Sequence, residues 1–282
     1  MLKITSSDNP RIKEVVRLKE RRARNASGLT IIDGVREVSR ALDVGVEFKE
    51  VYLCPEFFAS RGNTELIDRL EGKKINVVEV SKEIFSKIAF GDRREGVVAV
   101  CQPKYVHLSQ LKPSAKPFYV ILDSVEKPGN LGAILRTCDG AGVDALLLSE
   151  LKTDIFNPNV IRASMGAVFS VPVVQAMREQ ILQFLRENKI KIMATSPAGQ
   201  KIYANANLRE PLAIVMGSEQ QGLDDFWMKN ADVLLRVPMH GRADSLNVSI
   251  TTAIIVYEAL RQRGETKTRP ASVTPPKTKD KT

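Results

Sequence analysis

An asparagine, a glycine and an arginine lie close together in the stretch ILDSVEKPGNLGAILRTCDGAG, at positions that suit anion binding. Asn130 and Gly132 follow an apolar run and a Pro-Gly turn, and they open a segment of helical composition. The first turn of a helix presents free backbone amides and the positive end of the helix dipole, which attract phosphate or another anion. A tight turn between a strand and a helix, with Glu150 as a solvated strand end, explains these residues equally well.

Arg136 lies six residues beyond Asn130, between the apolar letters AIL and the letters TC. We expect this arginine to be partly buried, and a buried guanidinium needs an anion or a carboxylate as its partner. The alternative is an arginine that extends from the flank of the helix into solvent.

A possible binding loop follows the apolar run LAIVM and precedes the helical letters LDDFW. Its residues are Gly217, Ser218, Glu219 and Gly222. Glycines let the backbone approach a ligand closely, and a carboxylate near a strand end can accept hydrogen bonds. The alternative is an ordinary loop with a helix cap at Asp224 or Asp225.

Polar residues also stand at the start of an apolar helix in VLLRVPMHGRADSLNVSITTAI. We predict a helix from Leu246, capped by Ser245 or Asp244. Capping does not explain Asn247 and Ser249, which we place inside this helix although both residue types are mediocre helix formers. Buried polar groups need partners, so a ligand could supply them.

The histidine, tryptophan and cysteine residues are explained by structural roles rather than by chemistry. We predict that His240 lies in a loop, that Trp227 packs a helix against the sheet, and that Cys138 fills the core. The chain has 3 widely spaced cysteines and 2 histidines, with no CxxC pair. This pattern indicates neither a disulfide framework nor a metal site.

A parallel sheet must position these groups. In residues 118–263, apolar strands alternate with helices, which predicts an α/β domain whose sheet is covered on both faces. Residues 1–102 show a similar alternation and predict a separate small α/β domain. Residues 103–117 contain three prolines and predict a linker, and residues 264–282 predict a disordered basic tail.

The composition is that of a globular protein with a polyanionic partner. The chain has 282 residues, 43% of them hydrophobic, and a formal net charge of +9. Its first 30 residues predict a basic amphipathic helix preceded by the turn and cap SSDNP. No apolar run approaches the roughly 18 residues of a membrane span, and no signal core is visible, so we expect a reducing, cytoplasmic setting.

Four motifs, taken in order, resemble the SpoU (TrmH-like) branch of the SPOUT RNA methyltransferases. They are EKPGNLGAILRTCDGAG, NPNVIRASMGAVFSVPV, IVMGSEQQGL and RVPMHGRADSLNVSITTAI, and the resemblance covers residues 118–263. The stretch SSDNPRIKEVVRLKERRARNASGLTIIDGVREVSRAL also resembles the small ribosomal-protein-like domain that many rRNA enzymes of this branch carry before the catalytic domain.

The resemblance implies an enzyme that uses S-adenosylmethionine to methylate a ribose 2′-hydroxyl in structured RNA. It implies a parallel α/β sheet with a C-terminal trefoil knot, and a homodimer with the site at the interface. The N-terminal domain favours 23S-type ribosomal RNA over transfer RNA as substrate. A non-catalytic RNA-binding ribosome-assembly factor is the alternative from another class, whereas a dinucleotide enzyme lacks its full glycine fingerprint.

Motif matching also implies the site residues. Those expected to be catalytic are Asn130, Arg136, Glu219, Ser245 and Asn247. Those expected to contact the cofactor are Thr195, Gly217, Val237, Met239 and Leu246. Gln220 stands where the family often has glycine, which affects the loop shape there.

The resemblance leaves two roles open for Arg136. It could act as a base assisted by the substrate phosphate, although arginine is almost always protonated in proteins. It could instead clamp the target phosphate and lower the pKa of the hydroxyl by its charge, while the proton leaves through a neighbouring group or water.

Overall fold

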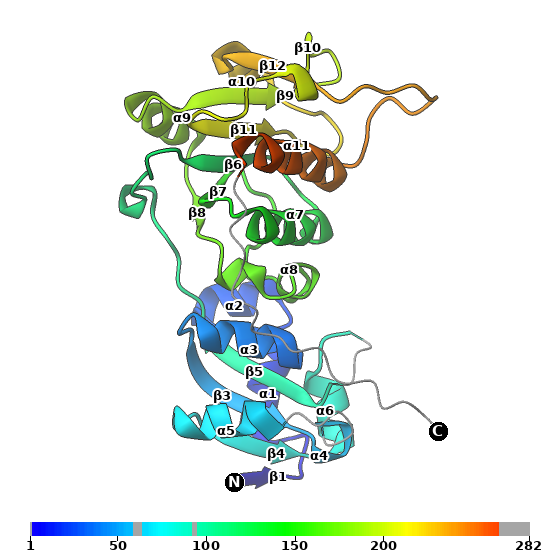
Figure 1. Cartoon of the computed structure of the whole chain (residues 1–282). Coiled ribbons are helices and arrows are strands. Elements are labelled where there is room, and N and C mark those ends of the chain that lie inside the picture. The colour runs from blue at the N-terminus through cyan, green and yellow to red at the C-terminus, as the bar shows by residue number, and fades with distance from the viewer. Residues whose placement is uncertain (1, 59–63, 92–94, 265–282) are drawn as a thin grey trace, which may run out of the picture.

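The computed structural model describes residues 2–58, 64–91 and 95–264. These residues form two sheets, one in the N-terminal part and one in the C-terminal part of an elongated molecule (Figure 1). The tail predicted for residues 264–282 lies outside the described residues, apart from Gly264. No described helix is long and apolar enough to cross a membrane.

The N-terminal sheet has five strands in the order β1-β4-β3-β5-β2, and β5 runs antiparallel to both of its neighbours. Apolar clusters cover both faces, under α1 and α6 on one side and under α3 and α5 on the other. The strands are β1 (Leu2–Ile4), β2 (Thr30–Asp33), β3 (Glu47–Leu53), β4 (Val77–Val80) and β5 (Val97–Gln102). The helices are α1 (Pro10–Arg17), α2 (Arg21–Ser27), α3 (Val35–Asp43), α4 (Pro55–Phe58), α5 (Thr64–Gly72) and α6 (Lys82–Ile88).

The single basic helix predicted near the N-terminus is wrong, because the chain turns between α1 and α2. Asn9 does cap α1, as the SSDNP turn predicted, by accepting a hydrogen bond from the backbone of Arg11 at 2.9 Å. At the corner, Arg24 Nη1 donates to the carbonyls of Leu18 and Lys19 at 2.9 and 2.8 Å. A buried arginine therefore uses carbonyl groups that a continuous helix would have paired internally.

The C-terminal sheet has seven strands in the order β10-β12-β9-β11-β6-β7-β8, and every pair is parallel, as the sequence predicted. Continuous apolar runs such as ALLLS and LAIVM form strands that are buried on both faces. The strands are β6 (Phe118–Asp123), β7 (Ala145–Ser149), β8 (Val173–Gln175), β9 (Lys191–Thr195), β10 (Lys201–Ile202), β11 (Leu212–Met216) and β12 (Val233–Arg236).

Helices cover both faces of this sheet. Side chains of α7 and α11 pack with Val120 and Leu122, whereas α9 and α10 pack against the opposite face with Tyr119 and Ile121. Trp227 of α10 is fully buried and Cys138 of α7 lies in the core, which confirms both predictions. The helices are α7 (Pro128–Ala141), α8 (Pro158–Ala163), α9 (Arg178–Glu187), α10 (Asp225–Asn230) and α11 (Val248–Arg263), with short 3-10 turns η2 (Leu108–Gln110), η3 (Ala167–Phe169) and η4 (Tyr203–Asn205).

The strand order brings distant loops to one edge of this sheet. β11 lies between β9 and β6, and β12 pairs with the other side of β9. Because the strands are parallel, the loops that follow them leave from the same edge, which is where open α/β sheets bind ligands. The trefoil knot stays a prediction.

Polar and apolar contacts join the two parts of the molecule. Arg24 Nη2 lies 2.7 Å from Asp154 Oδ2, and the two side chains are only 4% and 10% exposed. Thr30 Oγ1 donates to the carbonyl of Phe156 at 2.7 Å. One apolar cluster also continues from β2 and α3 through α8 into the C-terminal sheet. An ion pair, a hydrogen bond and shared apolar packing therefore join the two parts.

Candidate active site

A cavity of about 450 Å³ opens at the edge of the C-terminal sheet, between the loops that follow β9, β11 and β12 and the start of α11. Every residue predicted to contact the cofactor lines it, namely Thr195, Gly217, Val237, Met239 and Leu246. Three of the residues predicted to be catalytic line it as well, namely Glu219, Ser245 and Asn247. The fold thus collects three separate loops of the chain around one space.

Hydrogen bonds connect three predicted residues at the mouth of this cavity. Asn130 Nδ2 donates to Glu219 Oε1 at 2.7 Å, and Asn247 Nδ2 donates to Asn130 Oδ1 at 3.1 Å. These residues come from the start of α7, the loop after β11 and the start of α11. Asn130 does not line the cavity itself, but it links the two loops that do.

Glu219 accepts hydrogen bonds from backbone as well as side chains. The amides of Glu126 and Lys127 both donate to its carboxylate at 3.3 Å. Burial alone would raise the pKa of Glu219, but the hydrogen bonds from Asn130, from its own backbone and from these amides outweigh it and lower the pKa. Glu219 is therefore an ionised anchor at neutral pH.

Asn247 caps α11, which corrects the predicted cap at Ser245 or Asp244 and the predicted start at Leu246. Its Oδ1 accepts hydrogen bonds from the backbone amide of Ser249 at 2.8 Å and from the Ser249 hydroxyl at 2.7 Å. Asn247 thus lies just outside the helix and Ser249 in its first turn, where both residue types are favourable. Ser249 supports the cap.

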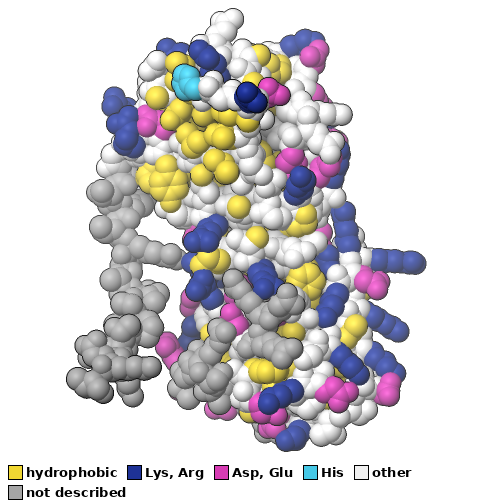
Figure 2. Space-filling model, turned by 90° about the vertical axis from the view of Figure 1, so that its right-hand side faces the viewer, with side chains coloured by type: hydrophobic (Ala, Val, Ile, Leu, Met, Phe, Trp, Pro, Cys, Tyr) yellow, Lys and Arg dark blue, Asp and Glu magenta, His cyan; other side chains and the backbone are white. Residues whose placement is uncertain are grey.

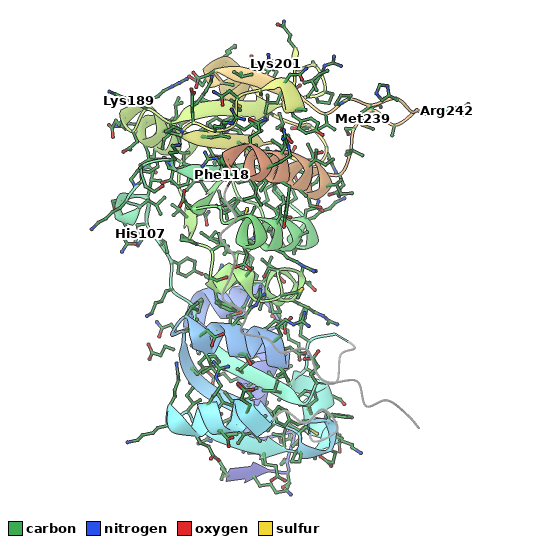
Figure 3. The ribbon with its side chains drawn as sticks, in the orientation of Figure 1. His107, Phe118, Lys189, Lys201, Met239 and Arg242 are labelled. Carbon is green, nitrogen blue, oxygen red and sulfur yellow. The ribbon has the colours of Figure 1, made fainter. Side chains whose placement is uncertain are left out.

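The loop between β12 and α11 carries Met239 and Ser245. Figure 3 shows this loop extending away from the body of the molecule, with Met239 near its start and Arg242 at its tip. Ser245 is exposed and Met239 partly exposed. The loop therefore forms one wall of the cavity and also a projection beyond it.

Arg136 does not reach this cavity, and its predicted partial burial is wrong. The side chain is exposed, and it makes no hydrogen bond or ion pair with another described residue. It lines a second cavity on the other side of the first turn of α7, together with residues of α8. Helix geometry explains this, because the apolar neighbours of Arg136 point to other faces of α7.

Gly217 is required by the shape of its own loop. A Cβ atom at this position would lie 2.1 Å from the carbonyl carbon of Gly222. Ser218 and Gly222 also exchange backbone hydrogen bonds at 3.0 and 3.1 Å, which close the turn. The glycine thus allows backbone to meet backbone within the loop, and its contact with the cofactor stays a prediction.

The cavity has a mixed apolar and charged lining and the size of a small-molecule site. Its volume lies in the range of roughly 300–1,000 Å³ that is common for small-molecule sites. Sequence reasoning missed the apolar residues Met216, Leu235 and Ile255 and the charged residues Lys127 and Asp244. Met216 could have been found, because it is the last residue of an apolar strand whose end meets the predicted loop.

Among the residues that the structure describes, no group of three or more His, Cys, Asp or Glu side chains could hold a metal ion. All three cysteines are buried and free, and burial raises the pKa of the Cys101 and Cys138 thiols. Neither thiol is placed to act as a nucleophile.

Comparison with known proteins agrees with this arrangement. Residues 117–257 match the family model described as SpoU rRNA Methylase family, and residues 9–99 match the MRM3-like substrate binding domain. The 23S rRNA (guanosine-2'-O-)-methyltransferase RlmB of Pectobacterium atrosepticum is 32% identical over 83% of this chain and 98% of that protein.

Two solved structures resemble the whole described fold. An RNA 2'-O ribose methyltransferase has a TM-score of 0.83 and 37% identity, covering 94% of this chain and all 100% of that one. An AdoMet-bound rRNA methyltransferase from Sinorhizobium meliloti has a TM-score of 0.83 and 32% identity, with 92% and 97% of the two chains covered. The chain belongs to the SpoU rRNA methylase family.

Proposed function

We propose that this chain transfers the methyl group of S-adenosylmethionine to a ribose 2′-hydroxyl of structured RNA, of the 23S ribosomal type. The observation that carries the proposal is the hydrogen-bonded set Asn130, Glu219 and Asn247 at the mouth of the cavity. It joins the first, third and fourth of the family-like motifs at one point.

The cavity residues fit the cofactor. S-adenosylmethionine supplies an electrophilic methyl group on its sulfonium when bound. Met216, Leu235 and Ile255 offer apolar surface for an adenine ring, and Lys127 and Asp244 offer charges for the amino acid end. Thr195 Oγ1 donates to the carbonyl of Val215 at 3.0 Å, so this hydroxyl is held against the sheet while its oxygen can still accept.

On the side of the methyl acceptor, the polar residues of the site would align the ribose and bind the charged phosphate of the RNA. The amides of Asn130 and Asn247 can orient the 2′-oxygen, and positioning of this kind supplies a large part of the rate acceleration. Glu219 is a poor general base because its pKa is lowered and its carboxylate is already hydrogen-bonded. We therefore propose that Arg136 clamps the target phosphate and that the proton leaves through water.

The remaining proposals concern assembly and substrate capture. We infer a cytoplasmic homodimer that forms through α11, on which Ile250 and Tyr257 are 51% and 50% exposed. Figure 2 looks onto the side of the molecule on which α11 lies in Figure 1. Hydrophobic side chains gather on the upper part of this face. The basic residues 1–102 would capture RNA through salt-sensitive phosphate contacts.

Labelled S-adenosylmethionine with large-subunit rRNA transcribed in vitro, and in parallel with transfer RNA, tests the function, with Arg136→Lys as the comparison. The wild type should place label on a ribose 2′-oxygen, and Arg136→Lys should lower turnover at least about tenfold, because lysine lacks the planar fork. Label only in transfer RNA would overturn the rRNA assignment. RNA binding without label in any RNA would favour an assembly factor, and a near-normal rate for Arg136→Lys would contradict both roles of that residue.

A further inference from the structure

The second cavity, of about 480 Å³, lies between the first turns of α7 and the helix α8. Its lining residues are Pro128, Gly129, Arg136, Asn159, Arg162, Ala163 and Met165. Two of them are arginines, and none of the described lining residues is an aspartate or a glutamate. Figure 2 shows Lys and Arg side chains at the waist of this face, below the hydrophobic patch. The cavity therefore favours an anion.

Tight helix packing sets the spacing of the two arginines. A Cβ atom at Gly132 of α7 would lie 2.5 Å from the Cβ of Ala163 and 2.9 Å from the carbonyl oxygen of Val160 in α8. The two helices can approach this closely only because residue 132 is a glycine. Arg136 and Arg162 consequently border the same space.

The N-terminal part of the chain holds Arg162 in place. Arg162 Nη1 donates to the carbonyl of Phe90 at 2.9 Å, and a Cβ atom at Gly91 would lie 1.9 Å from the same nitrogen. Burial raises the pKa of Asp33 to about 6, against the opposing effects of a hydrogen bond from the Phe90 amide and of the charge of Arg162. The hydrogen bond of Nη1 thus fixes the guanidinium group of Arg162 against the N-terminal part of the chain.

The cavity adjoins the proposed methyl-transfer site. Lys127 lines the first cavity and its neighbour Pro128 lines the second. An RNA strand whose target ribose lies at Asn130 therefore has to cross only the first turn of α7 to reach Arg162. Guanidinium groups bind phosphate with two parallel hydrogen bonds, and the amide of Asn159 is a further donor.

We propose that this cavity binds a phosphodiester of the RNA strand next to the target nucleotide, with Arg162 and Asn159 as its donors beside Arg136. The inference rests on the proposed function and adds a specific site to it. Because Phe90 positions Arg162, the N-terminal part helps to build this site as well as to capture RNA. Correct orientation of the two parts thereby becomes a condition for threading the strand.

RNA binding across a range of salt concentrations tests the site without relying on catalysis. The probe is unmodified large-subunit rRNA transcribed in vitro, bound to the full chain and to the variants Arg162→Ala and Asn159→Ala. Arg162→Ala should reduce the slope of log K against log salt by about 0.7, the value for one lost phosphate contact. Asn159→Ala changes no charge, so it should weaken RNA binding severalfold while leaving this slope unchanged.

Controls separate phosphate binding from a structural role. Arg186→Ala removes an arginine of α9 that pairs with Asp232 at 2.7 Å on the opposite face of the sheet from α7, and it should leave RNA affinity unchanged. Arg162→Lys keeps the charge but not the fork, so it should keep the slope and raise KM for RNA more than it lowers kcat. Affinity of each variant for S-adenosylmethionine should match the wild type.

Each outcome decides the proposal. Unchanged RNA affinity and slope in Arg162→Ala and Asn159→Ala would overturn it. A change from dimer to monomer in Arg162→Ala, with an unchanged RNA slope, would also overturn it by identifying a second copy of the chain as the occupant. If wild-type protein binds rRNA with an Arg162-dependent slope but methylates no RNA, the phosphate site stands and the proposed function fails.

Discussion

At the residue scale, the side-chain amide of Asn247 makes contacts from both of its ends. Its oxygen caps α11 through the backbone and hydroxyl of Ser249, and its nitrogen donates to Asn130. One side chain thus begins the helix and fixes the orientation of a residue at the site. The two tasks require different atoms, so substitutions can separate them.

Asn247→Asp should keep the cap and lose the site contact. Aspartate caps helices as well as asparagine does, so thermal stability should remain near that of the wild type, while methyl transfer should fall at least about tenfold because the donor to Asn130 is gone. Asn247→Ala should lose both and cost about 1 kcal/mol of unfolding free energy. Equal thermal stability of Asn247→Ala and wild type would contradict the capping role.

Glu219→Gln tests the ionised anchor through its pH dependence. The folded-state pKa of Glu219 is lowered from 4.5, so the stabilisation it provides is complete above pH 4.5 and is lost as pH falls through the folded-state value. At pH 7 the variant should unfold more easily by about 1 kcal/mol, and this difference should shrink in acid. Urea unfolding at several pH values measures it.

The rate profile supplies a second check on Glu219. Between pH 6 and 9 the variant and the wild type should show methyl-transfer profiles of the same shape, with the variant slower throughout. A rising limb that is present in the wild type and absent from Glu219→Gln would instead identify this carboxylate as the base.

At the element scale, the loop after β11 depends on contact between its own backbone atoms. Gly217→Ala would place a methyl group against the backbone of Gly222, so the loop must shift. We expect a loss of about 1–3 kcal/mol of unfolding free energy and a large drop in affinity for S-adenosylmethionine. Isothermal titration and thermal unfolding measure the two effects.

Gly241→Ala is the matched control for that substitution. A Cβ atom at Gly241 would meet nothing within 4 Å, and its backbone is not in the left-handed region. Stability should therefore stay within about 0.5 kcal/mol of the wild type. If both glycine variants bind the cofactor equally well, the loop after β11 is not a rigid wall of the site.

At the scale of the whole molecule, the buried pair Arg24 and Asp154 joins the two parts. Arg24→Ala would leave Asp154 buried without its partner, which costs about 3–5 kcal/mol in similar cases. We expect a lower midpoint in urea unfolding, together with weaker methylation of rRNA. Arg22→Ala removes an exposed arginine of the same helix and should change stability by less than about 0.5 kcal/mol. Similar midpoints for the two variants would show that the pair does not join the parts.

Some of this could be predicted from the sequence for clear physical reasons. The runs ALLLS and LAIVM are short, continuously apolar and separated by helical segments, which is typical of parallel strands buried on both faces, so the parallel sheet was predictable. The resemblance to the family implied that Gly217, Glu219 and Met239 belong to one site, and the structure places them around one cavity because each follows the end of a parallel strand. Spacing along the chain suffices for features of this kind.

The tertiary structure alone decided the direction of individual side chains and the contacts between distant segments. Arg136 is exposed and lies beside α8, and Asn247 begins α11 while it contacts α7. Both follow because the packing of α7 against α8 and α11 selects which helix face meets which neighbour. Arg24 is buried only because Asp154 comes from the other part of the chain. The sequence determined which residues gather at the sheet edge, whereas their partners depended on long-range packing that local spacing does not encode.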